Sequence, residues 1–195
     1  MPQHAHSTTR PDADPQSLHL RFHPDRVLRT KAEPVGEVTD NVREVAARMV
    51  EIMRQEEGIG LAAPQVGLSW RMFVCAIPAD RSSGSLPDHI QEHTGGEPWA
   101  CIDPVLRPVG DLESIEEGCL SLPDIRGQVN RQHAVVMEAT GLDGKKFEVQ
   151  AVGLLARCIQ HEVDHLDGVL IIDKFGQLDR LRTRSAVRKL ERKAR

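Results

Sequence analysis

The chain has 195 residues and a mass of 21.7 kDa, the size of one ordinary domain with or without tails. Apolar residues make up 39% and charged residues 28%, which provides for a core and excludes wholesale disorder. The net charge of −4 argues against nucleic-acid binding over the whole surface, and 3% aromatic residues disfavour a binding face of stacked rings.

The beginning of the chain is polar, and we predict that residues 1–17, rich in His, Pro, Ser and Thr, form a disordered tail. The tail lacks the apolar stretch of a secretory signal, and no apolar run reaches the roughly 18 residues that span a bilayer. We therefore expect a cytoplasmic protein without a membrane partner. In such a chain, cysteines indicate buried thiols, a metal ligand or a nucleophile rather than disulfides. There are four: Cys75, Cys101, Cys119 and Cys158.

The first half of the chain predicts one helix and two strands. Thr39, Asp40 and Asn41 are capping residues, and apolar residues follow at helical spacing, so a helix is expected over about 41–55, ended by Gly58. Three further segments follow from composition: a buried strand over 71–77, a long surface loop over 78–98, and a strand over 101–106 that Pro104 places at an edge or a bulge.

The second half predicts a hairpin, a helix and a short strand. The expected elements are strands over 133–139 and 145–151 around a turn at Gly141–Gly144, a helix over 154–166 capped by Gly168, and a buried strand over 169–172. Strands flank the helices without regular alternation, so the predicted fold class is α+β. We expect antiparallel or mixed sheets packed around the central 154–166 helix, with an N-terminal and a C-terminal helix.

The end of the chain is strongly basic. Residues 180–195 carry eight Lys or Arg residues and one Glu, a local net charge of +7. Two interpretations remain open for this segment: a solvated amphipathic helix, or a patch that contacts a polyanion.

The predicted 154–166 helix contains an HExxH motif. His161 and His165 are four positions apart, which places both imidazoles on one helix face, where they can hold one metal ion. Glu162 lies beside the open position of such an ion and can move protons. The helix is apolar almost all round and therefore buried, and charged groups inside a protein need partners or a metal. The alternative is a pair of core histidines satisfied by the backbone.

A catalytic metal of this kind needs a third protein ligand. The usual metalloprotease positions fail, because Ile171 stands where a third His is expected and no Glu occurs between Leu166 and Leu190. Cys119, next to a glycine, is the best candidate. Cys158 is its rival, although it is more simply explained as a small buried residue. A Cys119 nucleophile with a histidine base is also possible, but it would leave the HExxH spacing without a purpose.

A third segment of note is GIGLAAPQVG over 58–67. Its small residues let another backbone approach closely. Gln65 is the one polar side chain in this run, so the segment predicts either the wall of a site with one amide donor or a tight helix-to-strand crossing with an incidental Gln.

Together these segments resemble the peptide deformylase family. The motifs GIGLAAPQ (58–65), EGCLS (117–121) and QHEVDHLDG (160–168) match its three signatures in order. The resemblance runs from about Leu18 to Phe175 and departs in the N-terminal tail and in the long 78–98 loop. It implies a catalytic domain over 18–177 and an additional basic C-terminal helix over 178–195, similar to the Gram-negative-like subclass.

The resemblance implies an enzyme that removes the N-formyl group from the initiator methionine of nascent bacterial or organellar proteins. One metal ion per chain would be bound by Cys119, His161 and His165. The family uses Fe²⁺ in the cell, and Zn²⁺, Ni²⁺ or Co²⁺ can occupy the site. Glu162 would act as general base and then acid, while Gln65 and the backbone N–H of Leu120 would form the oxyanion hole.

Substrate binding also follows from the resemblance. Backbone groups of Ile59, Gly60 and Gly118 would pair with an extended formyl-methionyl peptide. The methionine pocket would be lined by Ile59, Ile115, Leu154 and Cys158, with Glu117 at its edge and Arg126 facing the peptide. The basic helix would dock on the ribosome, and no DNA partner is expected. The competing hypotheses are another metallopeptidase-like hydrolase and a non-catalytic metal-binding protein, which would need a fourth protein ligand.

Overall fold

The computed structural model describes residues 12–77 and 98–194, and within them the fold is α+β as predicted. The helices are α1 (Asp40–Gln55), α3 (Gly153–Leu166), α4 (Ile171–Lys174) and α5 (Gln177–Lys193), with 3₁₀ turns at Pro15–Ser17, Arg26–Arg29 and Ala63–Val66. The strands are β1 (Gly60–Ala62), β2 (Met72–Cys75), β3 (Trp99–Gly118), β4 (Arg126–Thr140) and β5 (Lys146–Val152). No described helix is both long and apolar enough to cross a bilayer.

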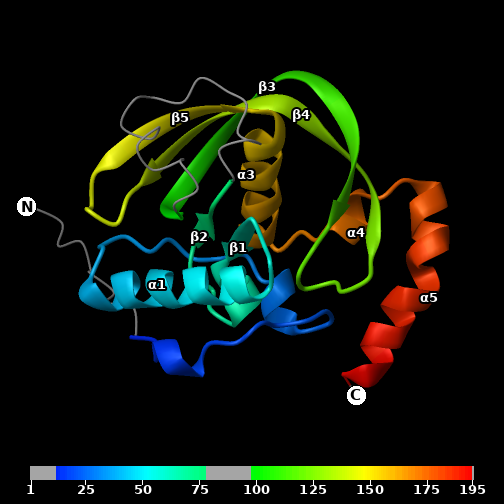
Figure 1. Ribbon diagram of the computed structural model, residues 1–195, viewed down its shortest axis with the longest axis horizontal. Coiled ribbons are helices and arrows are strands. Elements are labelled where there is room, and N and C mark those ends of the chain that lie inside the picture. The colour runs from blue at the N-terminus through cyan, green and yellow to red at the C-terminus, as the bar shows by residue number, and fades with distance from the viewer. Residues whose placement is uncertain (1–11, 78–97, 195) are drawn as a thin grey trace, which may run out of the picture.

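These strands form one sheet in the order β1-β2-β3-β4-β5, and every neighbouring pair is antiparallel. The long β3–β4 pair runs from Ile102↔Thr140 to Gly118↔Arg126. Its register shifts between Ile102 and Val105, so Pro104 lies at a bulge as predicted. Figure 1 shows this curved pair arching over the upright helix α3 and reaching toward α4.

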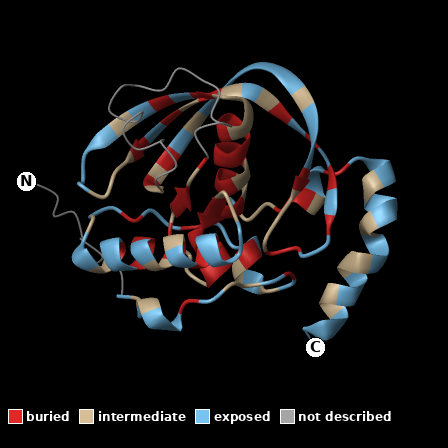
Figure 2. Cartoon of the chain, in the orientation of Figure 1, coloured by how far each residue is buried: buried red, intermediate tan, exposed pale blue. Residues whose placement is uncertain are grey.

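The strand β2 separates two layers of core, because successive side chains point to opposite faces of a sheet. Phe73 and Cys75 belong to the core against α3, whereas Met72 and Val74 belong to the core against α1. All four side chains are fully buried. The helix α3 is buried along most of its length, as Figure 2 shows by its red ribbon, so the HExxH motif lies inside the molecule.

The turn after α3 depends on Gly168, which has a φ of +73°. A Cβ at this position would lie 2.8 Å from the backbone carbonyl oxygen of Arg29, so glycine is required both for the left-handed backbone and for the close approach. This confirms the prediction that Gly168 ends the helix.

The C-terminal helix α5 packs on a third, smaller core. Ala186, Val187 and Leu190 lie against a cluster that includes Leu122, Ile125 and Phe175. Every residue of α5 is at least partly exposed, and Figure 2 shows the helix at the side of the molecule without a buried turn. The predicted C-terminal helix is therefore present, with its basic surface open to solvent.

Two predicted elements differ from the structure. The strand expected at 169–172 is wrong: the chain forms α4 instead, and the Asp173 carboxylate accepts a hydrogen bond from the Leu170 N–H at 2.8 Å, closing a helical turn. A short buried apolar run fits either state, and periodicity alone cannot choose between them. The strand predicted over 101–106 is only the start of β3, whose exposed, charged second half owes its conformation to pairing with β4.

The structure also bears on the expected tail. Ala13, within the predicted tail, exchanges two hydrogen bonds with the Asn41 side chain of α1, at 2.9 and 2.8 Å, so this part of the tail is held against α1. The disorder predicted for residues 1–11 and the loop predicted over 78–97 lie outside the described residues, and the division at 177/178 stays a prediction.

The core between α1 and β2 offers a test of the packing. Met49 is fully buried there, so Met49→Ala should lower the free energy of unfolding by about 2–5 kcal/mol, measured by urea denaturation of the metal-loaded protein. Glu44 is exposed on the same helix, and Glu44→Ala should cost less than about 0.5 kcal/mol. Equal losses in the two variants would contradict the assigned core.

Candidate active site

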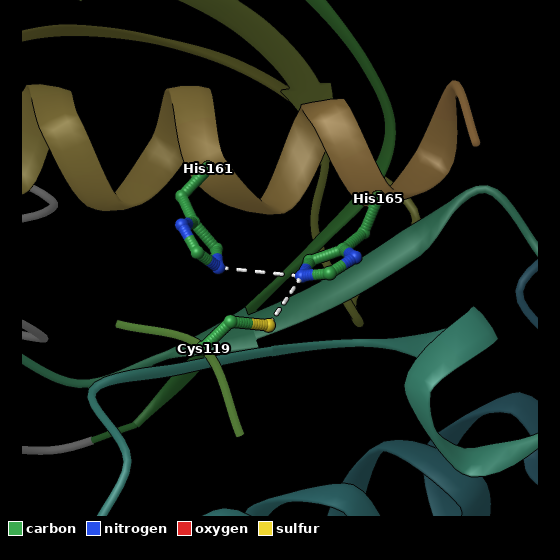
Figure 3. Close-up of side chains that lie close together, drawn as sticks. All are labelled: Cys119, His161 and His165. Carbon is green, nitrogen blue, oxygen red and sulfur yellow. Dashed lines mark hydrogen bonds between the residues drawn. The ribbon is translucent and has the colours of Figure 1, made fainter. Parts of the chain in front are cut away.

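The two histidines of α3 face the end of β3. His161 Nε2 and His165 Nε2 lie 3.3 Å apart, on the same side of the helix, as the four-residue spacing predicts. Figure 3 shows both rings pointing away from α3 toward the segment that carries Cys119. Burial lowers the pKa of His165, which favours the neutral imidazole that binds metals.

Cys119 completes the cluster from a distant part of the chain. It directly follows Gly118, the last residue of β3, and its Sγ lies 3.2 Å from His165 Nε2. The sulfur and the ligand nitrogens of His161 and His165 all lie within 4.8 Å of one another. One thiolate and two imidazoles at this separation form a donor set that suits several transition metals, so the residues fit the ion that the sequence predicts.

Glu117 supports this cluster from behind. Its Oε2 accepts a hydrogen bond from His161 Nδ1 at 3.1 Å, which leaves the lone pair of Nε2 free to bind a metal. Arg131 donates to both carboxylate oxygens at 2.6 and 2.9 Å, and Arg157 donates to Oε1 at 2.7 Å. Burial opposes the charged carboxylate, but the hydrogen bonds from His161 and Arg131 outweigh it and lower the pKa of Glu117 to about 2.

The network continues to the short helix α4. Arg131 Nη1 donates to Asp164 Oδ2 at 2.7 Å, and Lys174 Nζ lies 3.0 Å from Asp164 Oδ1. Arg131 is only 2% exposed, so its charge depends on the two carboxylates that surround it.

Gln65 lies next to Cys119, in the 3₁₀ turn after β1. Its Oε1 accepts the Ala62 N–H at 2.8 Å, which fixes the orientation of the amide because a backbone N–H can only donate. Its Nε2 lies 3.7 Å from Cys119 Sγ and 3.3 Å from Ser121 Oγ. The predicted amide donor therefore reaches the cluster.

Glu162 presents a buried carboxylate beside the histidines. It is 3% exposed, and its Oε2 has no hydrogen-bond partner among the described residues. Burial raises the pKa of Glu162 to about 7, a value suited to proton transfer at neutral pH. A Cβ at position 60 would fall inside contact distance of Glu162 Oε1 and 2.8 Å from Cys158 Sγ, so only glycine lets β1 pass here.

A cavity of about 560 Å³ opens in front of the cluster. Almost every residue predicted for the site lines it: Ile59, Gly60, Gln65, Ile115, Glu117, Gly118, Cys119, Leu120, Arg126, Leu154, Cys158, His161 and Glu162. His165 is 1% exposed and lies behind Cys119. Glu117 lines the cavity as predicted, and its carboxylate is in addition bound to His161 and two arginines, contacts that the prediction did not include.

Sequence reasoning did not find three polar residues that hold the site. Arg157 could have been noticed, because an arginine on an otherwise apolar buried helix needs an acidic partner. Arg131 gave no local signal, since its partner Glu117 is distant in the chain. Ser121 belongs to the EGCLS motif over 117–121, but the sequence did not indicate its contact with the distant Gln65.

The other cysteines match the expectation of buried thiols. Cys75 and Cys101 are fully buried in the core, and Cys158 lies on the cavity wall with its Sγ 3.5 Å from the Ile59 carbonyl oxygen. A hydrogen bond with Cys75, together with burial, raises the pKa of Cys158. Among the described residues, the group close enough to share an ion contains Cys119 and not Cys158.

An HExxH helix, a cysteine from a second segment and an adjoining cavity define the class of metal-dependent hydrolases. A family model described as polypeptide deformylase matches residues 18–181. The chain belongs to the polypeptide deformylase family. It is 42% identical over 176 residues to a peptide deformylase of Acinetobacter baumannii (strain SDF), covering 90% of this chain and 92% of that protein.

Other similar proteins are also peptide deformylases. A peptide deformylase of Chromohalobacter salexigens is 41% identical over 170 residues, covering 87% of this chain and 92% of that protein. The crystal structure of Plasmodium falciparum peptide deformylase matches with a TM-score of 0.79 at 32% identity, over 90% of this chain and 96% of that one. The structure of a Synechococcus elongatus peptide deformylase in complex with actinonin matches with a TM-score of 0.75 at 35% identity, over 94% of this chain and 90% of that one.

The contact between Glu117 and His161 predicts an effect on metal binding. Glu117→Gln should weaken the affinity for Zn²⁺ about 10- to 100-fold, because the amide is a poorer acceptor for the imidazole N–H and leaves two buried arginines short of charge. Competition with a chromophoric chelator measures the affinity. Glu113→Gln, at an exposed position of the same strand, is the control; unchanged affinity in Glu117→Gln would contradict the assigned contact.

Proposed function

We propose that this chain is a peptide deformylase that hydrolyses the N-formyl group of the initiator methionine of nascent proteins, giving formate and a free α-amine. The observation that carries the proposal is the convergence of Cys119, His161 and His165 within 4.8 Å at a cavity that also contains the Glu162 carboxylate. Membership of the deformylase family supports the substrate class.

The proposed ligands are Cys119 Sγ, His161 Nε2 and His165 Nε2, which would hold one Fe²⁺ ion, with Zn²⁺, Ni²⁺ or Co²⁺ as substitutes. A bound divalent ion acts as a Lewis acid and lowers the pKa of a coordinated water toward about 7. The hydrogen bond from His161 to Glu117 keeps that imidazole oriented and in the tautomer that binds.

Glu162 is the proposed proton carrier. Its unpaired Oε2 and its raised pKa suit a group that takes a proton from the attacking water and returns it to the departing amine. The amine is a poor leaving group, so this second transfer is needed to break the C–N bond. Gly60 has no side chain to collide with this carboxylate, so β1 can pass close to it.

Negative charge develops on the formyl oxygen during attack, and fixed donors in a dry site stabilise it by about 3 kcal/mol each. Gln65 Nε2 and the Leu120 backbone N–H are the proposed donors; Gln65 and Leu120 both line the cavity. An extended peptide would pair with backbone groups of Ile59, Gly60 and Gly118, and its methionine side chain would enter the part of the cavity lined by Ile115, Leu154 and Cys158.

The test is formate release from a formyl-Met tripeptide by the metal-loaded chain, with the unformylated and the acetylated tripeptides as comparison substrates. We expect release from the formylated peptide alone, and loss of turnover after the metal is removed with a chelator. Glu162→Ala should retain the metal and lower kcat by a factor of about 10² or more, because the proton carrier is missing.

Two outcomes would contradict the proposal. Cleavage of the unformylated peptide would favour a metallopeptidase, and a metal-loaded chain inert on every peptide would favour a non-catalytic metal protein. Turnover near the wild-type rate in Glu162→Ala would remove Glu162 from the mechanism.

We further propose a cytoplasmic protein that docks on the ribosome through α5. The helix exposes Arg184, Arg188 and Lys189, while Ala186, Val187 and Leu190 pack on the third core, so its basic surface is suited to phosphate groups. Arg184→Glu/Arg188→Glu/Lys189→Glu should weaken salt-sensitive ribosome binding at least tenfold in a sedimentation assay and leave tripeptide deformylation unchanged.

The control is Lys145→Glu/Lys146→Glu, which reverses two exposed charges, one in the turn between β4 and β5 and one on the first residue of β5. This control should bind ribosomes normally. Equal binding by both variants would refute a role for α5.

A further inference from the structure

Ser121 is a fully buried polar residue to which the proposed mechanism gives no role. It lies two positions after Cys119, in the turn that leads from β3 toward β4, and it is 0% exposed. Its Oγ accepts a hydrogen bond from Gln65 Nε2 at 3.3 Å. A buried hydroxyl aimed at the proposed oxyanion donor calls for an explanation beyond packing.

The geometry of the Gln65 amide explains what the hydroxyl can do. Because Oε1 is held by the Ala62 N–H, Nε2 is left with two hydrogens to place. Two acceptors lie within reach of Nε2: Ser121 Oγ at 3.3 Å, and Cys119 Sγ at 3.7 Å at the proposed metal centre. The final torsion of a glutamine side chain is broad, so the amide plane needs contacts on both sides to stay fixed.

We propose that Ser121 is a positioning residue for Gln65. By accepting one N–H, its hydroxyl turns the second N–H toward the cavity beside Cys119, where the formyl oxygen binds. The inference rests on the proposed deformylase function, because it concerns the aim of an oxyanion donor. Hydrogen-bond donors stabilise the transition state most when they need no reorientation during the reaction.

The backbone of Ser121 has a separate role that a side-chain substitution leaves in place. Its carbonyl oxygen accepts the His23 N–H at 3.0 Å, and the turn itself is closed by the Leu122 N–H to the Cys119 carbonyl oxygen at 3.0 Å. Changing the side chain therefore tests the hydroxyl without removing the hydrogen bonds that shape the turn.

The test is a double-mutant cycle on formyl-Met tripeptide hydrolysis. Ser121→Ala should lower kcat about tenfold with KM and bound metal unchanged, because the contact acts on the transition state. In a Gln65→Ala background the same change should alter kcat less than about twofold, since no amide is left to position. A residue that only supports the fold would lower activity equally in both backgrounds, and that result would overturn the inference.

A second pair of variants covers the case in which a smaller side chain disturbs folding. Ser121→Thr and Ser121→Val have matched volumes and differ in the hydroxyl, so the threonine variant should keep at least fivefold more kcat at equal melting temperature. Equal activities in this pair would also overturn the inference. Formate release by the wild-type chain serves as the reference. If the wild-type chain releases no formate, the proposed function fails. If it does, and Ser121→Ala has the same kcat as the wild type, only the role of Ser121 is rejected.

Discussion

The site depends on the meeting of one sulfur with two imidazoles carried by different elements. His161 and His165 need only a helix, because four residues return the chain to the same face. Cys119 reaches them only if β3 ends where α3 passes, and the 3.2 Å separation of Cys119 Sγ and His165 Nε2 shows that it does. Both layers of core contribute, since β2 is buried against α1 on one face and against α3 on the other.

The site also depends on a balance of buried charges next to the proposed metal ligands. A buried carboxylate and a buried guanidinium are each costly alone, and removing one member leaves the others uncompensated. Glu117, Arg131 and Asp164 are therefore best regarded as one unit, joined to α4 through Lys174. This unit fixes the ring of His161 more firmly than packing alone would, because the N–H···O contact sets both its direction and its tautomer.

The sequence predicted features that depend on neighbouring residues, and it did not predict features that depend on contacts between distant parts of the chain. Helical spacing in 41–55 and 154–166 predicted α1 and α3, and the HExxH motif located two of the three residues that could hold an ion. Cys119 could be favoured by elimination, and the family resemblance added Gln65 and Leu120. The second half of β3, the role of Arg131 and the contact of Ser121 with Gln65 could not be predicted, because they depend on residues distant in the chain. The error at 169–172 came from four apolar residues that suit a strand or a helical turn equally well.

Cys119 and His165 are separated by 46 positions along the chain, which has a consequence for folding. An ion held by both residues acts as a cross-link that closes a loop containing β4, β5 and most of α3. By analogy with a disulfide of that span, such a closure removes chain entropy from the unfolded ensemble equivalent to about 4 kcal/mol. Binding of the proposed ion and completion of the sheet would thus be thermodynamically linked, and the free energy of unfolding would depend on the free metal concentration.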